Sequence, residues 1–471
     1  MHIGSVLIKK SRIQINNSYS NSISTDTLEM FFAMLLFKMS CDIGYWYLIS
    51  RDTQTYRADF NGVKFAIGLI CCICLFWGID HKSRKPSAFF LNLIFLLQII
   101  PITTIYTLGN DNTVYYVSLC AGMAVCELIV RSKNSFEVRR EMNISILFIL
   151  LCGCITIGTV MILIYKYRMP STIALNIYRV YELRRSGSFA PGKIFSSYFI
   201  PWITVVFIPF GIAKSIERKN YLITTFCCMA LLLIYLYSGH KSYLFAIPFV
   251  LTCTIWARRK KYYKEIFITS CIVYVLVMAF ALLEADEHGF FSQIYSLFGR
   301  RCMIVSANNK FKYYDYFSTH PLMGIYGMFP RFLMPIRSYY ENIPYTFVIS
   351  DIYYGKPEMN SNTGFMAEGY MRFGYIGIIG IFVLLAFILK GIDRFEIRTS
   401  AQLAIGLFVY PIFGLADAHL IDSLVLGPWM ILVIILLVYK EKPAKNDERI
   451  SYEANLSLLQ SNNQNIFQQH L

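Results

Sequence analysis

Four long stretches without a charged side chain constrain the fold of this chain more than any other feature. They cover residues 87–110, 142–165, 194–213 and 220–239. A helix of about 20 apolar residues is long enough to cross the hydrocarbon core of a bilayer. Charged residues make up only 15% of the sequence, whereas a soluble domain carries about 25%. The chain is therefore not a water-soluble enzyme, and we expect an all-α, polytopic integral membrane protein.

Further apolar stretches bring the expected number of transmembrane helices to about twelve. Five of these stretches are clear and three are weaker: 242–257, 266–283, 374–389, 400–416 and 423–439, then 30–50, 65–79 and 113–130. Lys38 and Asp42 are one helical turn apart in 30–50, so we interpret them as a neutralised structural pair. Glu127 lies near the end of 113–130, where its carboxylate is expected to reach the headgroups.

The basic residues between these stretches predict the orientation. With the N-terminus inside, the seven inner segments carry 25 Lys and Arg residues, and the four short outer loops carry four. This asymmetry follows the positive-inside rule and places both termini in the cytoplasm. Because the basic residues are spread over many short loops, the net charge of +15 does not indicate nucleic-acid binding. We expect one membrane domain over 1–441 and a disordered cytoplasmic tail over 442–471.

Two outer segments stand out as candidates for function. Segment 166–193 holds six basic residues and one acidic residue, against the positive-inside rule, which suggests a bound anion. Within it, 171–185 has the apolar spacing of an amphipathic surface helix, and Arg179, Arg184 and Arg185 give it a cationic side suited to a lipid diphosphate. The alternative is ordinary contact with lipid headgroups. The second segment, 284–373, is about 90 residues long, is rich in aromatic residues and is expected to be a long loop.

Other residue patterns indicate packing rather than chemistry. Gly374, Gly377 and Gly380 lie on one flank of a helix, which favours close packing of helices. The cysteines lie mostly inside the apolar stretches, so no disulfide framework is expected. No Walker A loop and no paired acidic motif with metal-ligand spacing occurs, and the cluster around Glu284 and Asp286 is interpreted as a solvated helix end. We therefore predict neither a metal nor another cofactor.

Three short stretches carry a resemblance to a known family. The first is Ser238-Gly239-His240-Lys241-Ser242, the second is Gly299-Arg300-Arg301 followed by His320-Pro321-Leu322-Met323-Gly324, and the third is Asn362-Thr363-Gly364 followed by Glu368, Gly374 and Gly377. In type and order these stretches resemble the bacterial O-antigen polymerase (Wzy-type) and O-antigen ligase superfamily. Ligases of this family usually carry a histidine just before the asparagine, and residues 360–361 contain none, which favours the polymerase.

The resemblance implies a fold and an activity. It implies a GT-C-like membrane glycosyltransferase with a long periplasmic loop between spans nine and ten. Such an enzyme of the bacterial inner membrane moves a growing glycan from undecaprenyl diphosphate onto a new lipid-linked repeat unit, at the periplasmic face. The implied partners are undecaprenyl-diphosphate-linked oligosaccharides, membrane lipid and a chain-length regulator. O-antigen ligase and lipid-linked oligosaccharide flippase remain the alternatives.

The same reasoning selects the candidate site residues. Fixed cations would stabilise the charge that builds on a departing diphosphate. We expect catalytic roles for Arg179, Arg300, His320 and Glu368. We expect substrate-binding roles for Arg184, Arg185, Lys241, Arg301, Asn362 and Arg372. The general base remains unassigned, and His320 has a second interpretation as a cap of a helix or turn.

Overall fold

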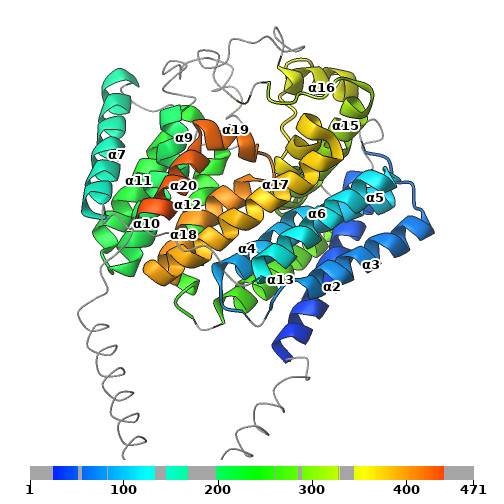
Figure 1. The fold of residues 1–471 in the computed structure, drawn as a ribbon, viewed down its shortest axis with the longest axis horizontal. Coiled ribbons are helices and arrows are strands. Elements are labelled where there is room, and N and C mark those ends of the chain that lie inside the picture. The colour runs from blue at the N-terminus through cyan, green and yellow to red at the C-terminus, as the bar shows by residue number, and fades with distance from the viewer. Residues whose placement is uncertain are drawn as a thin grey trace, which may run out of the picture. The chain divides into compact units, whose positions relative to one another are not determined.

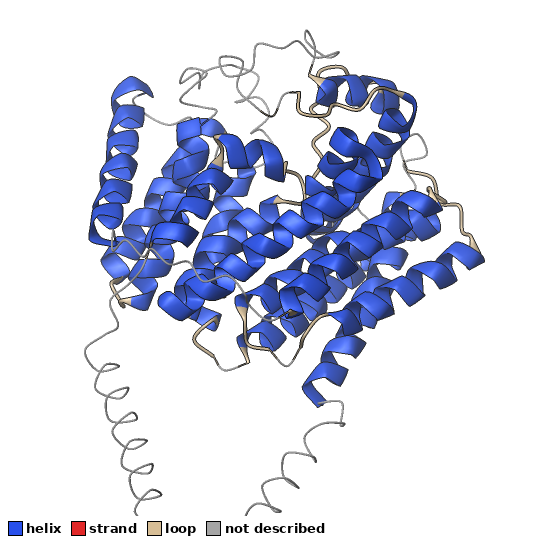
Figure 2. Ribbon diagram, in the orientation of Figure 1, coloured by secondary structure: helices blue, strands red, loops and turns tan. Residues whose placement is uncertain are grey.

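The computed structural model describes residues 25–50, 56–81, 83–132, 145–167, 198–259, 261–284, 289–326, 328 and 344–439. All regular secondary structure in these ranges is helical, which confirms the predicted all-α class (Figure 2). The predicted surface helix 171–185, with Arg179, Arg184 and Arg185, lies outside the described residues. The predicted tail 442–471 lies outside them as well.

The helices fall into two compact units (Figure 1). The first unit comprises Met1–Ser132, Arg259–Ala386 and Ile412–Ile421. Its helices are α2 (Thr25–Gly44), η1 (Tyr45–Ile49), α3 (Gly62–Gly78), α4 (Pro86–Ile94), η2 (Phe95–Ile99), α5 (Ile100–Leu108), α6 (Thr113–Arg131), α13 (Tyr262–Leu283), α14 (Phe290–Tyr295), η6 (Ser296–Val305), α15 (Ser306–Thr319) and α16 (Tyr345–Tyr354).

The second unit comprises Lys133–Arg258, Phe387–Pro411 and Asp422–Leu471. Its helices are α7 (Ser145–Tyr167), α9 (Ile200–Trp202), η5 (Ile203–Phe207), α10 (Ile208–Glu217), α11 (Tyr221–Ser238), α12 (Lys241–Trp256) and α20 (Pro428–Val438). Three helices contribute residues to both units: α17 (Phe365–Arg398), α18 (Ala401–Gly414) and α19 (Leu420–Val425).

Among the residues that the structure describes, seven helices are long and apolar enough to cross a membrane. They are Thr25–Ile49, Pro86–Leu108, Thr113–Arg131, Ile200–Glu217, Tyr221–Ser238, Tyr262–Leu283 and Phe365–Arg398. Shorter apolar helices occupy the other predicted stretches, so the number of twelve spans stays a prediction. On α2, Phe32, Leu36 and Met39 lie on one side and are 57–59% exposed. Such an uncovered apolar stripe suits contact with lipid.

The structure confirms one predicted ion pair and corrects the prediction for Glu127. Lys38 donates to Asp42 across 2.6 Å, and Thr104 donates to the same carboxylate across 2.7 Å, as a structural pair requires. Glu127 does not reach outward, because it is only 3% exposed. Its carboxylate packs against Gly78 of α3, where a Cβ would lie 1.9 Å from Oε2. The missing side chain of Gly78 therefore makes the space that Glu127 fills.

The three glycines of α17 do not form a shared packing surface. Gly374 has φ +63 and ψ −145 and bends the helix. A Cβ on Gly377 would lie 2.0 Å from the carbonyl oxygen of Gly369, so its close contact is with the first part of α17 itself. A Cβ on Gly380 would meet nothing within 4 Å. Close helix packing is therefore confirmed at Gly377, and it is wrong for Gly374 and Gly380, because the bend places these glycines in different surroundings.

The expected long loop 284–373 is largely helical among its described residues. It holds α14, η6, α15, α16 and the first part of α17. Glu284 accepts the N–H groups of Phe291 and Ser292 and so caps α14, which lowers the pKa of its carboxyl group. These helices were missed because hydropathy detects apolar helices, and α15 is polar.

Candidate functional site

The polar helix α15 forms the centre of the candidate site. It packs on η6, α5 and α16 within the first unit (Figure 1). Asn308 and Asn309 are 5% and 4% exposed, and Lys310 is completely buried. Lysine is almost never fully buried unless it is paired. The partners of these three side chains therefore show how the site is held together.

Lys310 is held by main-chain and hydroxyl oxygens. Its Nζ donates to Ser306 Oγ across 2.8 Å and to the carbonyl oxygen of Ala416 across 3.1 Å. Ser306 donates to the same Ala416 oxygen across 2.6 Å. Burial lowers the pKa of the Lys310 ammonium to about 8, and the nearby Asp417 carboxylate partly opposes this shift. Ser306 and Lys310 thus form a hydrogen-bonded pair of a hydroxyl and an amine, and both side chains are closed off from solvent.

The stretch 361–364 runs along α15 and is fixed to it by two hydrogen bonds, and a third hydrogen bond joins the next residue, Phe365, to the turn 415–419. Asn309 Nδ2 donates to the carbonyl oxygen of Asn362 across 2.6 Å, and Tyr313 donates to that of Ser361 across 2.8 Å. Phe365 N donates to the carbonyl oxygen of Leu415 across 3.3 Å. Gly364 lies against the same turn, where a Cβ would be 2.3 Å from two carbonyl oxygens. A glycine is therefore required there, and the Asn362 side chain is left exposed.

Glu368 and Arg372 form a buried ion pair on the first part of α17. Arg372 Nε donates to Glu368 Oε1 across 3.3 Å, with side chains 1% and 0% exposed. The second carboxylate oxygen accepts the N–H of Ile421 across 3.0 Å. Both oxygens of Glu368 thus have partners inside the first unit, which is the condition under which a buried charge is tolerated.

Arg372 also holds the turn 323–326. Its Nη1 donates to the carbonyl oxygens of Gly324 and Tyr326 across 3.1 and 3.0 Å. In return, Met323 N and Gly324 N donate to the carbonyl oxygens of Met371 and Arg372, each across 2.9 Å. Four hydrogen bonds therefore join the stretch after His320 to the stretch after Asn362. The structure thus brings together two of the three stretches that carry the family resemblance.

His320 is placed at the end of α15. Its main-chain N–H and its Nδ1 both lie close to the carbonyl oxygen of Tyr316, at 3.1 and 2.9 Å. Its ring stacks on the Tyr316 ring, with centroids 4.0 Å apart. This geometry matches the interpretation of His320 as a helix cap. The imidazole is also exposed, so its catalytic role stays a prediction.

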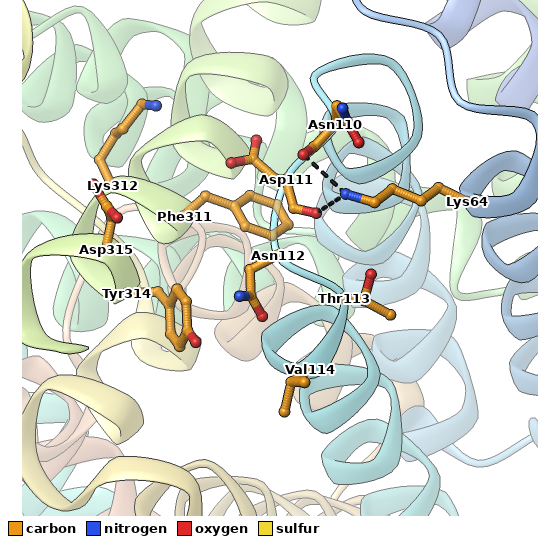
Figure 3. Close-up of a pocket in the computed structure, with 10 residues that line it drawn as sticks. All are labelled: Lys64, Asn110, Asp111, Asn112, Thr113, Val114, Phe311, Lys312, Tyr314 and Asp315. Carbon is orange, nitrogen blue, oxygen red and sulfur yellow. Dashed lines mark hydrogen bonds between the residues drawn. The ribbon is translucent and has the colours of Figure 1, made fainter.

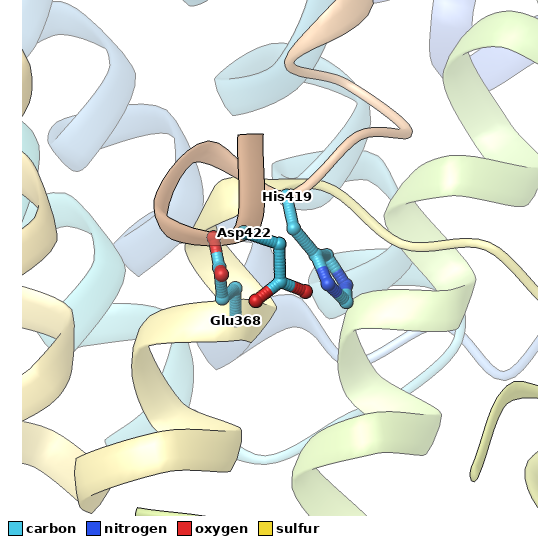
Figure 4. A group of neighbouring side chains, drawn as sticks. All are labelled: Glu368, His419 and Asp422. Atoms are coloured by element: carbon cyan, nitrogen blue, oxygen red, sulfur yellow. The ribbon is translucent and has the colours of Figure 1, made fainter. Parts of the chain in front are cut away.

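His419 lies beside Glu368 (Figure 4). Its Nδ1 is 3.0 Å from the Tyr345 hydroxyl, and the two rings are nearly parallel. Asp422 follows Ile421 in the short helix α19. One ligand atom each of Glu368 and His419 lies within 4.8 Å of the other, and a carboxylate and an imidazole are groups that can hold a cation. The expectation that no metal is needed stays a prediction.

The remaining predicted residues lie on several elements. Arg300 and Arg301 are on η6, and the Arg300 guanidinium is 5.9 Å from the centre of the Tyr56 ring. Arg301 is exposed, and its charge acts on Asp417. Lys241 is the first residue of α12, in the second unit. Arg301 thus lies near Asp417, whose charge also acts on Lys310, and Arg300 lies on η6 together with Arg301.

No family model, curated protein or solved structure matches this chain. The site is therefore interpreted from its own geometry.

Sequence reasoning missed Ser306, Lys310, His419 and Asp417. One signal was available: the run Ser306-Ala-Asn-Asn-Lys310 is polar but lies between the apolar residues Ile304 and Val305 on one side and Phe311 on the other. Polar residues in such a place are usually paired with each other. Their partners on the turn 415–419 are about a hundred residues away in the sequence, so no local pattern indicates them.

Proposed function

We propose that the chain is an O-antigen repeat-unit polymerase of the bacterial inner membrane. It would have twelve spans in a GT-C-like arrangement, with both termini in the cytoplasm and α15 on the periplasmic side. Its substrates would be undecaprenyl-diphosphate-linked oligosaccharides. The product would be a longer glycan on the incoming lipid-linked unit.

One observation supports this proposal most: Arg372 joins two of the stretches that resemble the O-antigen polymerase and ligase superfamily. The turn 323–326 and the residues 371–372 exchange four hydrogen bonds. These contacts bury the Arg372 guanidinium, which costs free energy, and a loop without a functional role would not require them. A function that requires these stretches side by side explains it.

The proposed reaction is a displacement at an anomeric carbon. A sugar hydroxyl of the new unit attacks that carbon, and the bond to the diphosphate oxygen breaks. The lipid diphosphate leaves with its electron pair, and a base takes the hydroxyl proton. Arg300, Arg301 and Arg179 are the proposed cations that stabilise the leaving diphosphate. His419, held by the Tyr345 hydroxyl, is the proposed base, and it fills the role that sequence reasoning left open.

Deletion of the gene in its host tests this proposal. The lipopolysaccharide of the deletion strain is separated on a gel and compared with that of the complemented strain. A core carrying a single repeat unit supports a polymerase. A bare core contradicts it and indicates a ligase or a flippase.

The position of His419 near Glu368 favours O-antigen ligase as a second candidate. Ligases of the family carry a histidine before the asparagine of the third stretch, and residues 360–361 contain none. His419 supplies an imidazole near Glu368 from a different part of the chain. If it replaces the family histidine, the deletion strain would produce bare core and accumulate polymer on its lipid carrier.

A further inference from the structure

A polar pocket lies on the other side of α15, within the first unit (Figure 3). Its volume is about 610 Å³, which is in the range of small-molecule sites. The turn between α5 and α6 forms one wall with Asn110 and Asp111. Residues Lys312, Tyr314 and Asp315 of α15 form the opposite wall. No predicted site residue lines this pocket.

The charges in the pocket are balanced. Two lysines, Lys64 and Lys312, face two aspartates, Asp111 and Asp315. Lys64 is already engaged, because its Nζ donates to the carbonyl oxygens of Asn110 and Asp111 across 2.9 and 2.6 Å. Asp315 accepts the Tyr353 hydroxyl across 2.7 Å. These contacts leave little excess positive charge, so a diphosphate is a poor ligand here.

Two groups with opposite charge remain available to a ligand. Within the described residues, the Asp111 carboxylate accepts no hydrogen bond and the Lys312 ammonium donates none. Lys312 lies over the Tyr353 ring, 5.7 Å from its centre. Burial raises the pKa of Asp111 to about 6, and the charges of Lys312 and Lys64 partly oppose this rise. A partly buried carboxylate without a donor is costly, and a ligand hydroxyl would supply the donor.

An aromatic ring with a fixed orientation completes the wall. Tyr314 stacks on Tyr115, with centroids 4.5 Å apart, and its hydroxyl is 3.1 Å from that of Tyr375. The ring therefore cannot turn freely. Apolar and aromatic surface combined with a few fixed polar groups is the usual design of a site that orients a small molecule.

We propose that this pocket binds an uncharged sugar ring. A sugar hydroxyl both donates and accepts, so neighbouring hydroxyls can donate to Asp111 and accept from Lys312. The apolar face of the ring would lie along Tyr314. The identification of this sugar as part of the acceptor glycan rests on the proposed function, whereas the chemistry of the pocket does not.

Saturation-transfer NMR on the full-length protein in nanodiscs tests the proposal. The probes are glucose, galactose, mannose, N-acetylglucosamine, N-acetylgalactosamine and rhamnose, with glucuronate and pyrophosphate as charged probes. We expect saturation transfer to at least one neutral sugar and no competition by pyrophosphate. Asp111→Asn and Lys312→Met should each weaken binding of that sugar at least tenfold.

Matched controls come from the exposed residues Asp351 and Lys356 of the α16 region. Asp351→Asn and Lys356→Met should bind the sugar as the wild type does. Lys312→Met keeps the test valid if Asp111→Asn does not fold. Three outcomes would overturn the proposal: no transfer to any neutral sugar, equal transfer in both pocket variants, or displacement of the sugar by pyrophosphate.

The two proposals can fail separately. Sugar binding together with a normal O-antigen ladder in the deletion strain would overturn the polymerase and keep the pocket. A lost ladder in the deletion strain without sugar binding by the purified protein would overturn the pocket proposal and keep the polymerase.

Discussion

Arg372 and Glu368 bind each other one helical turn apart, and each also holds a different stretch of the first unit. Arg372 binds the turn 323–326, and Glu368 binds the N–H of Ile421. The pair therefore connects α17 with two segments that are distant from it in the sequence. Both side chains are buried. The contribution of the pair to stability is therefore measured by unfolding of the purified protein, separately from any role in catalysis.

We expect Glu368→Ala to destabilise the protein strongly. The change leaves a buried guanidinium without its counter-charge, which costs about 3–5 kcal/mol. The thermal midpoint of the purified protein in detergent measures it. Glu358→Ala, at an exposed glutamate, is the control and should leave the midpoint almost unchanged. An unchanged midpoint for Glu368→Ala would show that the ion pair does not support the fold.

Lys310→Met should keep or raise the stability of the protein at pH 7. Burial disfavours the charged form of Lys310, as its lowered pKa shows, and methionine has a similar length without that charge. The pKa of Lys310 is about 8 in the folded state and 10.5 ordinarily. The unfolded state therefore binds more protons between these pH values, and wild-type stability should rise from pH 8 to pH 10 relative to the variant. A fall over this range would contradict the assignment.

Acid should destabilise the protein through His81. Burial lowers the pKa of its imidazole to about 4, while the nearby charges of Asp80 and Arg131 act in opposite directions. Its Nε2 lies 2.8 Å from the carbonyl oxygen of Phe76, and its Nδ1 has no hydrogen-bond partner in the described structure. Between pH 6.5 and about 4 the unfolded state binds the proton and the folded state does not, so stability falls as pH falls.

The expected loss between pH 7 and pH 5 is about 2 kcal/mol, at 1.36 kcal/mol per pKa unit. Thermal midpoints of wild type and His81→Asn at the two pH values measure it, because the asparagine has no group that titrates there. His240→Asn, at an exposed histidine, should keep the wild-type pH dependence. Equal acid sensitivity of wild type and His81→Asn would contradict the prediction.

Arg300→Ala should shorten the O-antigen ladder of a complemented deletion strain. Loss of one cation that stabilises the leaving diphosphate costs roughly 2–4 kcal/mol of transition-state stabilisation. Arg300→Lys should restore only part of it, because a point charge replaces a planar fork. Arg179→Ala should behave like Arg300→Ala. Full ladders at wild-type protein levels, checked by blot, would remove these arginines from the proposed mechanism.

Polymer formation by the purified protein should survive EDTA, since the proposed cations are arginines. Incorporation of labelled repeat units with and without chelator measures this. Loss of activity that Mg²⁺ or Mn²⁺ restores would redirect the mechanism to Glu368 and His419. In that case His419→Ala should abolish the rescue by metal.

The sequence predicts what depends on local periodicity. The Lys38–Asp42 pair could be predicted because residues four apart in a helix face each other. The surroundings of Glu127 could not, because they depend on Gly78 in another helix. The bonds of Ser306 and Lys310 to Ala416 span more than a hundred residues. Such contacts depend on how helices pack, and a single sequence does not reveal it.

The Ala416 carbonyl oxygen accepts from both Ser306 and Lys310, and this has a consequence for mutagenesis. The acceptor belongs to the main chain, so any residue at 416 that keeps the backbone path still offers it. An alanine scan passes over this position altogether, because the residue is already alanine. This anchor of the turn 415–419 is thus not revealed by replacing the side chain at 416, whereas changes at Ser306 and Lys310 do remove its donors.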